Sequence, residues 1–189
     1  MRISNESGIS RVTTEIPREH GSGFGMKYFH AIGMVVLGAL AAGAADVRLE
    51  ANSTSPRAGG RVIVRIVVDD VEDLDTYGVK VSYDPAALEL VAADIEAPSM
   101  GITNTLRRPG RTLIPLVKKH PGLVHIAATL TGNGDGLTAE KAVVGVIAFT
   151  VRREQECVLK LTDTRLLNSR AEPLEGNDES KPIVLNEGL

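Results

Sequence analysis

Two histidines, His120 and His125, are the side chains best suited to acid-base chemistry in the region that follows the N-terminal apolar segment. Histidine is the side chain whose ordinary pKa lies closest to neutral pH. A hydrolytic site also needs a nucleophile within hydrogen-bond reach of such a base, and the sequence contains no nucleophile-elbow motif or comparable arrangement. His125 lies in the middle of a predicted strand, where a packed or rim histidine is the commoner role. We therefore predict no catalytic residues and no enzymatic activity.

Two segments carry oxygen ligands of the kind that calcium takes, the acidic run Asp69 to Asp75 and the glycine-rich segment Gly132 to Gly136. The acidic run lacks the central glycine and the distal glutamate of an EF-hand loop. We interpret it as a solvated connection between strands, and the second segment as a turn whose glycines allow positive φ. The single cysteine, Cys157, excludes an intramolecular disulfide and a cysteine-based zinc site. No metal site and no cofactor is predicted.

Basic residues gather in and near a predicted loop and edge strand. They are Arg107, Arg108, Arg111, Lys118 and Lys119. They are interpreted either as a contact for an acidic partner surface or as a solvated face, since edge lysines also deter pairing with another chain. The whole chain of 189 residues has 21 basic and 24 acidic side chains, a net charge of -3. This balance excludes nucleic acid as the default partner, because a phosphate-backbone binder carries a basic surplus.

The elements that must position these residues are short β-branched segments separated by turn residues, a pattern typical of a two-sheet sandwich. The predicted strands are 47–51, 61–69, 76–84, 88–93, 112–118, 123–130, 143–152, 156–162 and 183–186. Residues 94–111 are predicted to be mostly loop. Pro115 lacks the N–H that a central strand needs, so strand 112–118 is predicted to lie at an edge or to contain a bulge.

The clearest alternation is in the strand 76–84. It places Tyr77 and Tyr83 on an inward row with Val79 and Val81, because successive side chains of a strand point to opposite faces. The outward row consists of Thr76, Gly78, Lys80 and Ser82. Asp84-Pro85 then breaks the strand, since proline has no N–H and disfavours the helical region for the residue before it.

Residues 26–45 have the layout of a secretory signal peptide. Lys27 supplies the basic start, an apolar run of about twelve residues follows, and small residues precede cleavage after Ala44 or Ala45. The run is shorter than the about 20 residues that cross a membrane; a buried core helix is the alternative. Residues 1–25 are interpreted as a misassigned start or a disordered leader, or else as a long n-region. We expect residues 46–189 to form one exported domain, extracellular or periplasmic, without a membrane anchor.

The segment from Thr76 to Leu90, TYGVKVSYDPAALEL, resembles the cohesin family. The corresponding cohesin strand ends in an aromatic-Asp-Pro turn, followed after two residues by Leu-Glu, as in Tyr83 to Glu89 here. Other parts follow the order of the family and extend the resemblance over about residues 46–187. They are Gly59–Val62, Gly122–Ala127, Gly132–Gly136 with the apolar strand 143–151, and Leu161–Leu167.

The resemblance implies an all-β fold, a nine-stranded jelly-roll β-sandwich. It also implies a non-catalytic module that binds a dockerin-type module of another chain in extracellular polysaccharide degradation. The partner-binding residues expected on this basis are Thr76, Gly78, Lys80 and Ser82. One sheet face can supply the about 800 Å² per partner that a standard interface buries.

Two other functions stay open. Direct carbohydrate binding is one, because cohesins resemble polysaccharide-binding modules in fold. Sugars stack on flat aromatic rings, but the chain has no tryptophan and only three tyrosines and three phenylalanines, and Tyr77 and Tyr83 share the predicted inward row. The other is a structural subunit of an envelope or secretion complex, since a fold alone does not fix a role.

Overall fold

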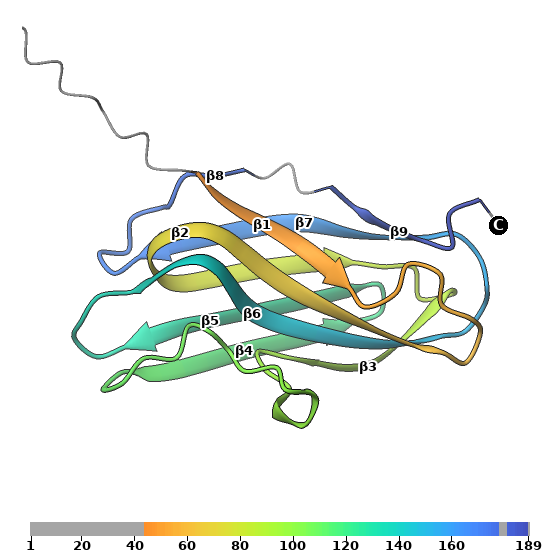
Figure 1. Ribbon diagram of the computed structural model, residues 1–189, viewed down its shortest axis with the longest axis horizontal. Coiled ribbons are helices and arrows are strands. Elements are labelled where there is room, and N and C mark those ends of the chain that lie inside the picture. Colours follow the sequence, from red (N-terminus) through yellow and green to blue (C-terminus); the bar gives the residue numbers. More distant parts are fainter. Residues whose placement is uncertain (1–43, 178–180, 189) are drawn as a thin grey trace, which may run out of the picture. The chain divides into compact units, whose positions relative to one another are not determined.

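The computed structural model describes residues 44–177 and 181–188 (Figure 1). The predicted leader and signal peptide lie outside the described residues, apart from Ala44 and Ala45. In the described ranges, no helix is long and apolar enough to cross a membrane.

The regular secondary structure of the described residues consists of strands, apart from one short 3-10 turn, and the prediction of an all-β sandwich is confirmed. One 3-10 turn, Pro98–Met100, interrupts the long loop after the third strand. The strands are β1 (Ala45–Ala51), β2 (Arg61–Ser82), β3 (Leu88–Asp94), β4 (Thr112–His120), β5 (Leu123–Thr131), β6 (Leu137–Val151), β7 (Cys157–Asn168), β8 (Gly176–Asn177) and β9 (Ile183–Leu185).

Strand β2 corrects the sequence prediction, because it is one strand of 22 residues where two strands and an acidic connection were expected. Within the acidic run, Asp70 and Asp73 have positive φ, 51° and 56°, a conformation that aspartate tolerates better than most residues. The register with β6 shifts between Val71 and Leu74, as at a β-bulge. The acidic residues therefore bend the strand without ending it.

The bend lets β2 belong to both layers of the sandwich (Figure 1). Its first part pairs with β1 and β6, and its second part, Thr76 to Ser82, pairs with β5 and β7. One layer has the order β3-β6-β2-β1-β8. The other has β4 beside β5, then β2, β7 and β9. This arrangement sets the second part of β2 in the middle of its layer, flanked by β5 and β7.

Strand β4 lies at an edge, as Pro115 predicted, since it pairs with β5 alone among the described strands. The Asp84-Pro85 corner is also confirmed. The Asp84 carbonyl accepts hydrogen bonds from the backbone N–H groups of Ala87 (3.2 Å) and Leu88 (2.9 Å), and its carboxylate accepts one from Ala86 N–H at 2.8 Å. This local closure returns the chain to the core at Leu88.

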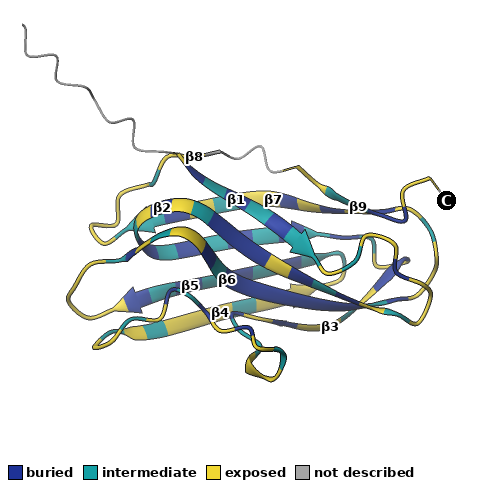
Figure 2. Cartoon of the chain, viewed as in Figure 1, coloured by how far each residue is buried: buried dark blue, intermediate teal, exposed yellow. Residues whose placement is uncertain are grey.

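The core lies between the two layers (Figure 2). The predicted inward row of β2 is confirmed, because Tyr77, Val79, Val81 and Tyr83 are all buried. The rings of Tyr83 and Phe149 pack at a centroid distance of 5.0 Å and a tilt of 55°, a favourable geometry for aromatic pairs. With this row fixed inward, the alternate residues of β2 must face solvent.

Candidate functional site

The four residues predicted to contact a partner lie together on the solvent side of β2. Thr76, Gly78, Lys80 and Ser82 are all half-buried, in strict alternation with the buried inward row. Strand pairing aligns them with outward residues of β4, β5 and β7. We name this surface the outer face. It comprises Thr112, Ile114, Leu116, Lys118 and His120 of β4; Leu123, His125, Ala127, Thr129 and Thr131 of β5; Thr76, Gly78, Lys80 and Ser82 of β2; and Lys160, Asp163, Arg165 and Leu167 of β7.

The centre of the outer face is apolar and combines small residues of β2 and β5 with larger side chains of β4. Gly78 lies opposite Ala127 of β5, which in turn lies opposite Leu116 of β4. Leu116 is 44% exposed and Ile114 is 49% exposed. Neither was predicted as a contact residue, although their alternation around Pro115 in an edge strand is a signal that sequence reasoning could have used. Large exposed apolar side chains beside small ones form a surface that a partner can cover.

Hydrogen bonds and one ion pair hold the polar residues of the outer face in place. Lys80 Nζ donates to Asp163 Oδ2 at 2.6 Å, and this contact lowers the pKa of Asp163. The hydroxyls of Thr76 and Thr129 lie 2.6 Å apart. Ser82 Oγ donates to the Lys160 carbonyl at 3.3 Å. These contacts join β2 to both neighbouring strands, so the face is preformed.

His125 lies between two lysines on this face, opposite Lys80 of β2 and Lys118 of β4. Partial burial and the positive charges of Lys80 and Lys118 lower its pKa, while Asp163 acts in the opposite direction. These effects together favour the neutral form of the imidazole. Gly78 lies beside it, since a Cβ added to that glycine would lie 3.6 Å from His125 Nε2.

A family model for the cohesin domain matches residues 47–178. The chain belongs to the cohesin family. This match spans the strands that build the outer face.

Solved cohesin structures have the same fold. A type II cohesin domain from the cellulosome of Acetivibrio cellulolyticus matches with a TM-score of 0.58 and 16% identity, over 76% of this chain and 96% of that chain. A mutant type II cohesin-X-dockerin complex from the same organism matches with a TM-score of 0.56 and 14% identity, over 75% of this chain and 98% of that chain. A non-cellulosomal cohesin from the archaeon Archaeoglobus fulgidus matches with a TM-score of 0.54 and 11% identity, over 74% of this chain and 89% of that chain. No curated protein matches the chain.

The five basic residues singled out in the sequence do not form one cluster in this cohesin. Arg107 pairs with Glu96 at 2.5 Å, and Arg111 pairs with Asp75 in the interior. Lys118 lies on the outer face, whereas Lys119, its neighbour in β4, points to the opposite side. The idea of a single acidic-partner contact built from all five is therefore wrong, because strand alternation and separate ion pairs divide them.

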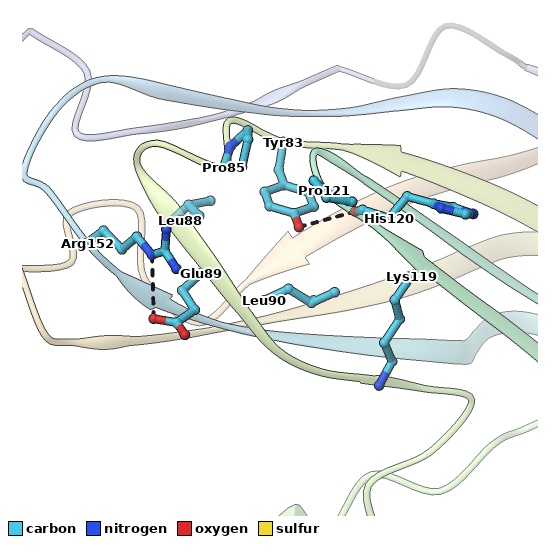
Figure 3. A pocket seen from close by; sticks show the side chains of 9 residues that line it. All are labelled: Tyr83, Pro85, Leu88, Glu89, Leu90, Lys119, His120, Pro121 and Arg152. Atoms are coloured by element: carbon cyan, nitrogen blue, oxygen red, sulfur yellow. Dashed lines mark hydrogen bonds and ion pairs between the residues drawn. The ribbon is translucent and has the colours of Figure 1, made fainter.

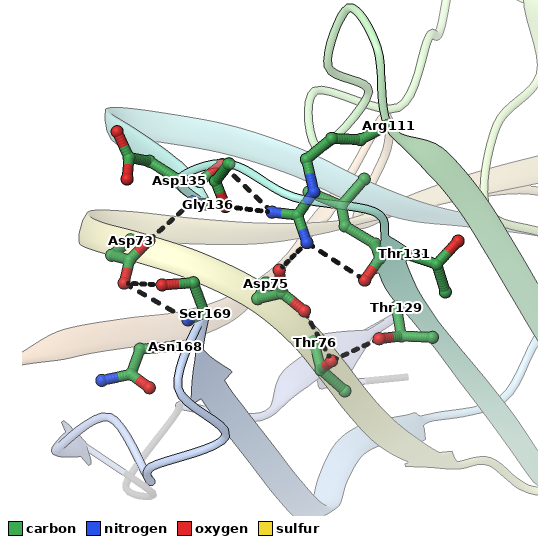
Figure 4. A network of polar contacts seen from close by, with 12 residues as sticks. Asp73, Asp75, Thr76, Arg111, Thr129, Thr131, Asp135, Gly136, Asn168 and Ser169 are labelled. Atoms are coloured by element: carbon green, nitrogen blue, oxygen red, sulfur yellow. Dashed lines mark hydrogen bonds and ion pairs between the residues drawn. The ribbon is translucent and has the colours of Figure 1, made fainter.

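Arg111 connects the bend of β2 to the glycine turn (Figure 4). Its guanidinium donates to Asp75, to the carbonyls of Gly134 and Asp135 at 3.1 Å each, and to the Leu130 carbonyl at 3.2 Å. Both side chains of the pair are largely shielded, with 6% of Arg111 and 12% of Asp75 exposed. The carbonyls of Gly134 and Asp135 in the glycine turn thus accept hydrogen bonds from an arginine.

A second acidic group of the bend, Asp73, also has protein partners. Asp73 accepts hydrogen bonds from Gly136 N–H at 2.6 Å, Ser169 Oγ at 2.6 Å and Ser169 N–H at 3.2 Å. These bonds outweigh partial burial and lower the pKa of Asp73. Among the described residues, no group of three or more His, Cys, Asp or Glu side chains is placed to hold a metal ion.

A groove of about 500 Å³ lies between β3 and the turn from β4 to β5 (Figure 3). Its lining consists of Tyr83, Pro85, Leu88, Glu89, Leu90, Lys119, His120, Pro121 and Arg152. Tyr83 Oη donates to the His120 carbonyl at 3.4 Å, and Arg152 lies 3.5 Å from Glu89. Tyr83 is only 9% exposed, and its ring packs against Phe149. The tyrosine is thus part of the core and does not offer a flat face for stacking on a sugar.

Proposed function

We propose that the chain is a cohesin module that binds a dockerin-type module of another protein through the outer face. The complex would serve protein assembly in extracellular polysaccharide degradation. The observation that carries the proposal is the preformed row of Thr76, Gly78, Lys80 and Ser82 on β2. Across the neighbouring strand β5 lie the exposed apolar side chains of β4, Ile114 and Leu116. Family membership and the solved cohesin-X-dockerin complex with the same fold support it.

The module acts by binding and not by catalysis in this proposal. Cohesins are binding modules, and His125, one of the two histidines of the outer face, lies between two lysines. Neither lysine can orient the imidazole as a general base. A general base needs a hydrogen-bond acceptor that holds one ring nitrogen and a nucleophile within hydrogen-bond reach of the other. Mutual affinity between preformed surfaces is then the whole function.

We further propose that residues 26–45 direct export and that residues 46–189 form the exported domain. The support is the charged start, short apolar run and small residues of the signal pattern. Ala45 is 4% exposed, and its N–H donates to the Glu175 carbonyl at 2.9 Å. N-terminal sequencing of protein from the culture medium or periplasm tests this proposal. A first residue at Ala45 or Asp46 supports it, and a product that stays in the cytoplasm with residues 1–45 attached contradicts it.

Dockerin binding is tested with Gly78→Arg. The glycine has no crowded neighbours, since an added Cβ would meet only His125 and Ala127 at 3.6 and 3.7 Å. The arginine therefore extends from the middle of the outer face without disturbing the core. Thr150→Arg is the matched control, because Thr150 is a half-buried strand residue opposite Arg61 on the outside of the other layer.

Calorimetric titration of purified dockerin modules into both variants and the parent protein gives the result. We expect binding to be lost in Gly78→Arg and retained in Thr150→Arg, with circular dichroism showing folded protein in both. Equal binding by the two variants would mean that the outer face is not the site. Absence of binding by the parent protein to every dockerin module would exclude the function.

A further inference from the structure

The outer face carries a basic surplus that the whole chain does not have. Its charged side chains are four cations, Lys80, Lys118, Lys160 and Arg165, and one anion, Asp163. Lys80 is paired with Asp163. The other three cations are exposed and form no ion pair with another described residue. In a chain with a net charge of -3, positive charge is thus concentrated on one side.

The outside of the opposite layer differs in having more acidic residues among its cations. There, Arg48 pairs with both Glu50 and Asp69, and Lys141 pairs with Glu50 at 2.7 Å. The paired cations and anions there neutralise one another, while Arg61 and Arg65, further along β2, form no ion pair with a described residue. On the outer face the three free cations have no such partners. They lie on β4 and β7, the two strands on either side of the β5–β2 pair that carries Ala127 and Gly78.

We infer that the partner of the outer face presents carboxylates around an apolar centre, so that an acidic rim meets Lys118, Lys160 and Arg165. This inference rests on the proposed function and adds the charge of the partner to it. The apolar centre excludes water, while the rim charges select the partner and set its orientation. A basic dockerin surface would place like charges together and is disfavoured.

The arrangement also predicts how the complex forms. Opposite charges on two exposed surfaces attract over about 8–10 Å at physiological ionic strength. Such attraction mainly raises the association rate constant and makes it sensitive to salt. The acidic residues on the rest of this chain repel the same partner, so that approach to the outer face is favoured over approach elsewhere.

The test reverses charges on the outer face and, as a control, on the other layer. The first variant is Lys118→Glu with Arg165→Glu. The control is Arg61→Glu with Arg65→Glu, two exposed arginines of β2 on the outside of the other layer. Neither forms an ion pair with a described residue, although Arg65 lies opposite Glu50 of β1. Both variants change the net charge equally, so an effect of net charge alone would alter the dockerin affinity of both variants by the same factor.

Purified dockerin modules, one group acidic and one group basic, are the probes, and titration calorimetry gives the dissociation constants at low and at physiological salt. We expect acidic dockerins to bind the parent protein more tightly than basic ones. The outer-face variant should lose affinity for the acidic dockerins on the order of tenfold or more. The dissociation constant of the control variant should stay within about twofold of that of the parent protein.

Three results would overturn the inference, and they are distinguishable. Tighter binding of basic dockerins, or an equal loss of affinity in the two variants, refutes the acidic partner while dockerin binding itself stands. Failure of every acidic and basic dockerin to bind the parent protein refutes the proposed function and the partner charge together. Thermal unfolding of both variants shows whether the comparison is made between folded proteins.

Discussion

Arg111 and Asp75 form an ion pair in the interior of the sandwich, with 6% and 12% of their side chains exposed. The pair joins the start of β4 to the bend of β2, and the same guanidinium holds the carbonyls of the glycine turn. A buried pair of this kind compensates two desolvated charges with each other. Removal of the pair should therefore destabilise the whole end of the molecule where β2 changes layers.

Arg111→Met should be strongly destabilising. The variant leaves the Asp75 carboxylate shielded from water without its counter-charge, and it frees the carbonyls of Leu130, Gly134 and Asp135. We expect the free energy of unfolding to fall by about 3–5 kcal/mol, the range for breaking one side of a buried pair. Urea unfolding followed by circular dichroism measures the change.

The matched control is Arg107→Met, which removes the ion pair with Glu96, where the Arg107 side chain is 56% exposed. Exposed pairs contribute little to stability because solvent screens them, so the loss should be much smaller than in Arg111→Met. A loss of similar size in the two variants would contradict the idea that shielding of Arg111 and Asp75 makes the difference.

Asn104 should matter more to stability than the tyrosine hydroxyl that it contacts. Tyr77 Oη and Asn104 Nδ2 both donate to the Val144 carbonyl, so Tyr77→Phe leaves that carbonyl bonded. Asn104→Ala instead leaves the Ile95 carbonyl and the Leu106 N–H without their partner. We expect losses of about 1 kcal/mol for Tyr77→Phe and about 2–3 kcal/mol for Asn104→Ala. The reverse order in urea unfolding would show that the loop is not held through Asn104.

Local patterns in the sequence predicted much of this fold. The alternation of Tyr77, Val79 and Val81 fixed which side of β2 is buried, and Pro115 placed β4 at an edge. The Asp84-Pro85 corner was also predictable, because proline chemistry and the aspartate side chain act within a few residues. Each of these features depends on near neighbours in the chain.

The features that sequence reasoning missed depend on residues far apart in the chain. An aspartate with positive φ suits a turn and a bulge equally well, so the acidic run did not reveal that β2 continues through it. Arg111 and Asp75 are 36 residues apart. The basic surplus of the outer face arises from the register of β4, β5, β2 and β7, which brings Lys118 and Arg165 to one surface.

Three glycines should differ in their tolerance of alanine. At Gly78 an added Cβ has ordinary contacts, so Gly78→Ala should change the free energy of unfolding by less than about 0.5 kcal/mol. At Gly145 the Cβ would lie 3.0 Å from Ile66 Cδ1, and we expect a loss of about 1–3 kcal/mol. At Gly136 it would lie 2.6 Å from the Leu74 carbonyl oxygen, in rigid backbone, so the loss should be the largest.

Thermal unfolding of the three alanine variants provides the ranking. The melting temperature should decrease in the order Gly78→Ala, Gly145→Ala, Gly136→Ala. A Gly136→Ala variant as stable as Gly78→Ala would mean that the bend of β2 and the start of β6 are not packed as closely as described.

Protonation of His125 should weaken the fold as the pH falls. In the folded chain, partial burial and then the charges of Lys80 and Lys118 lower the pKa of His125 below its ordinary value of 6.5, and Asp163 offsets part of this effect. The unfolded chain therefore takes up the proton first. The contribution of His125 to stability is fully present above pH 6.5. It decreases as the pH falls toward the lowered pKa, because the unfolded state then binds more protons. His125→Gln should remove this part of the pH dependence.

Two lysine variants test the cause of the lowered pKa directly, by NMR titration of the His125 ring proton. Lys118→Met removes a positive charge that faces the imidazole across the β4–β5 pair, and the pKa should rise toward 6.5. Lys119→Met removes the same charge from the opposite side of β4, where the side chain lines the groove of Figure 3, and should leave the pKa nearly unchanged. Equal shifts in the two variants would mean that the net charge of the protein, and not the position of Lys118 on the outer face, controls the titration of His125.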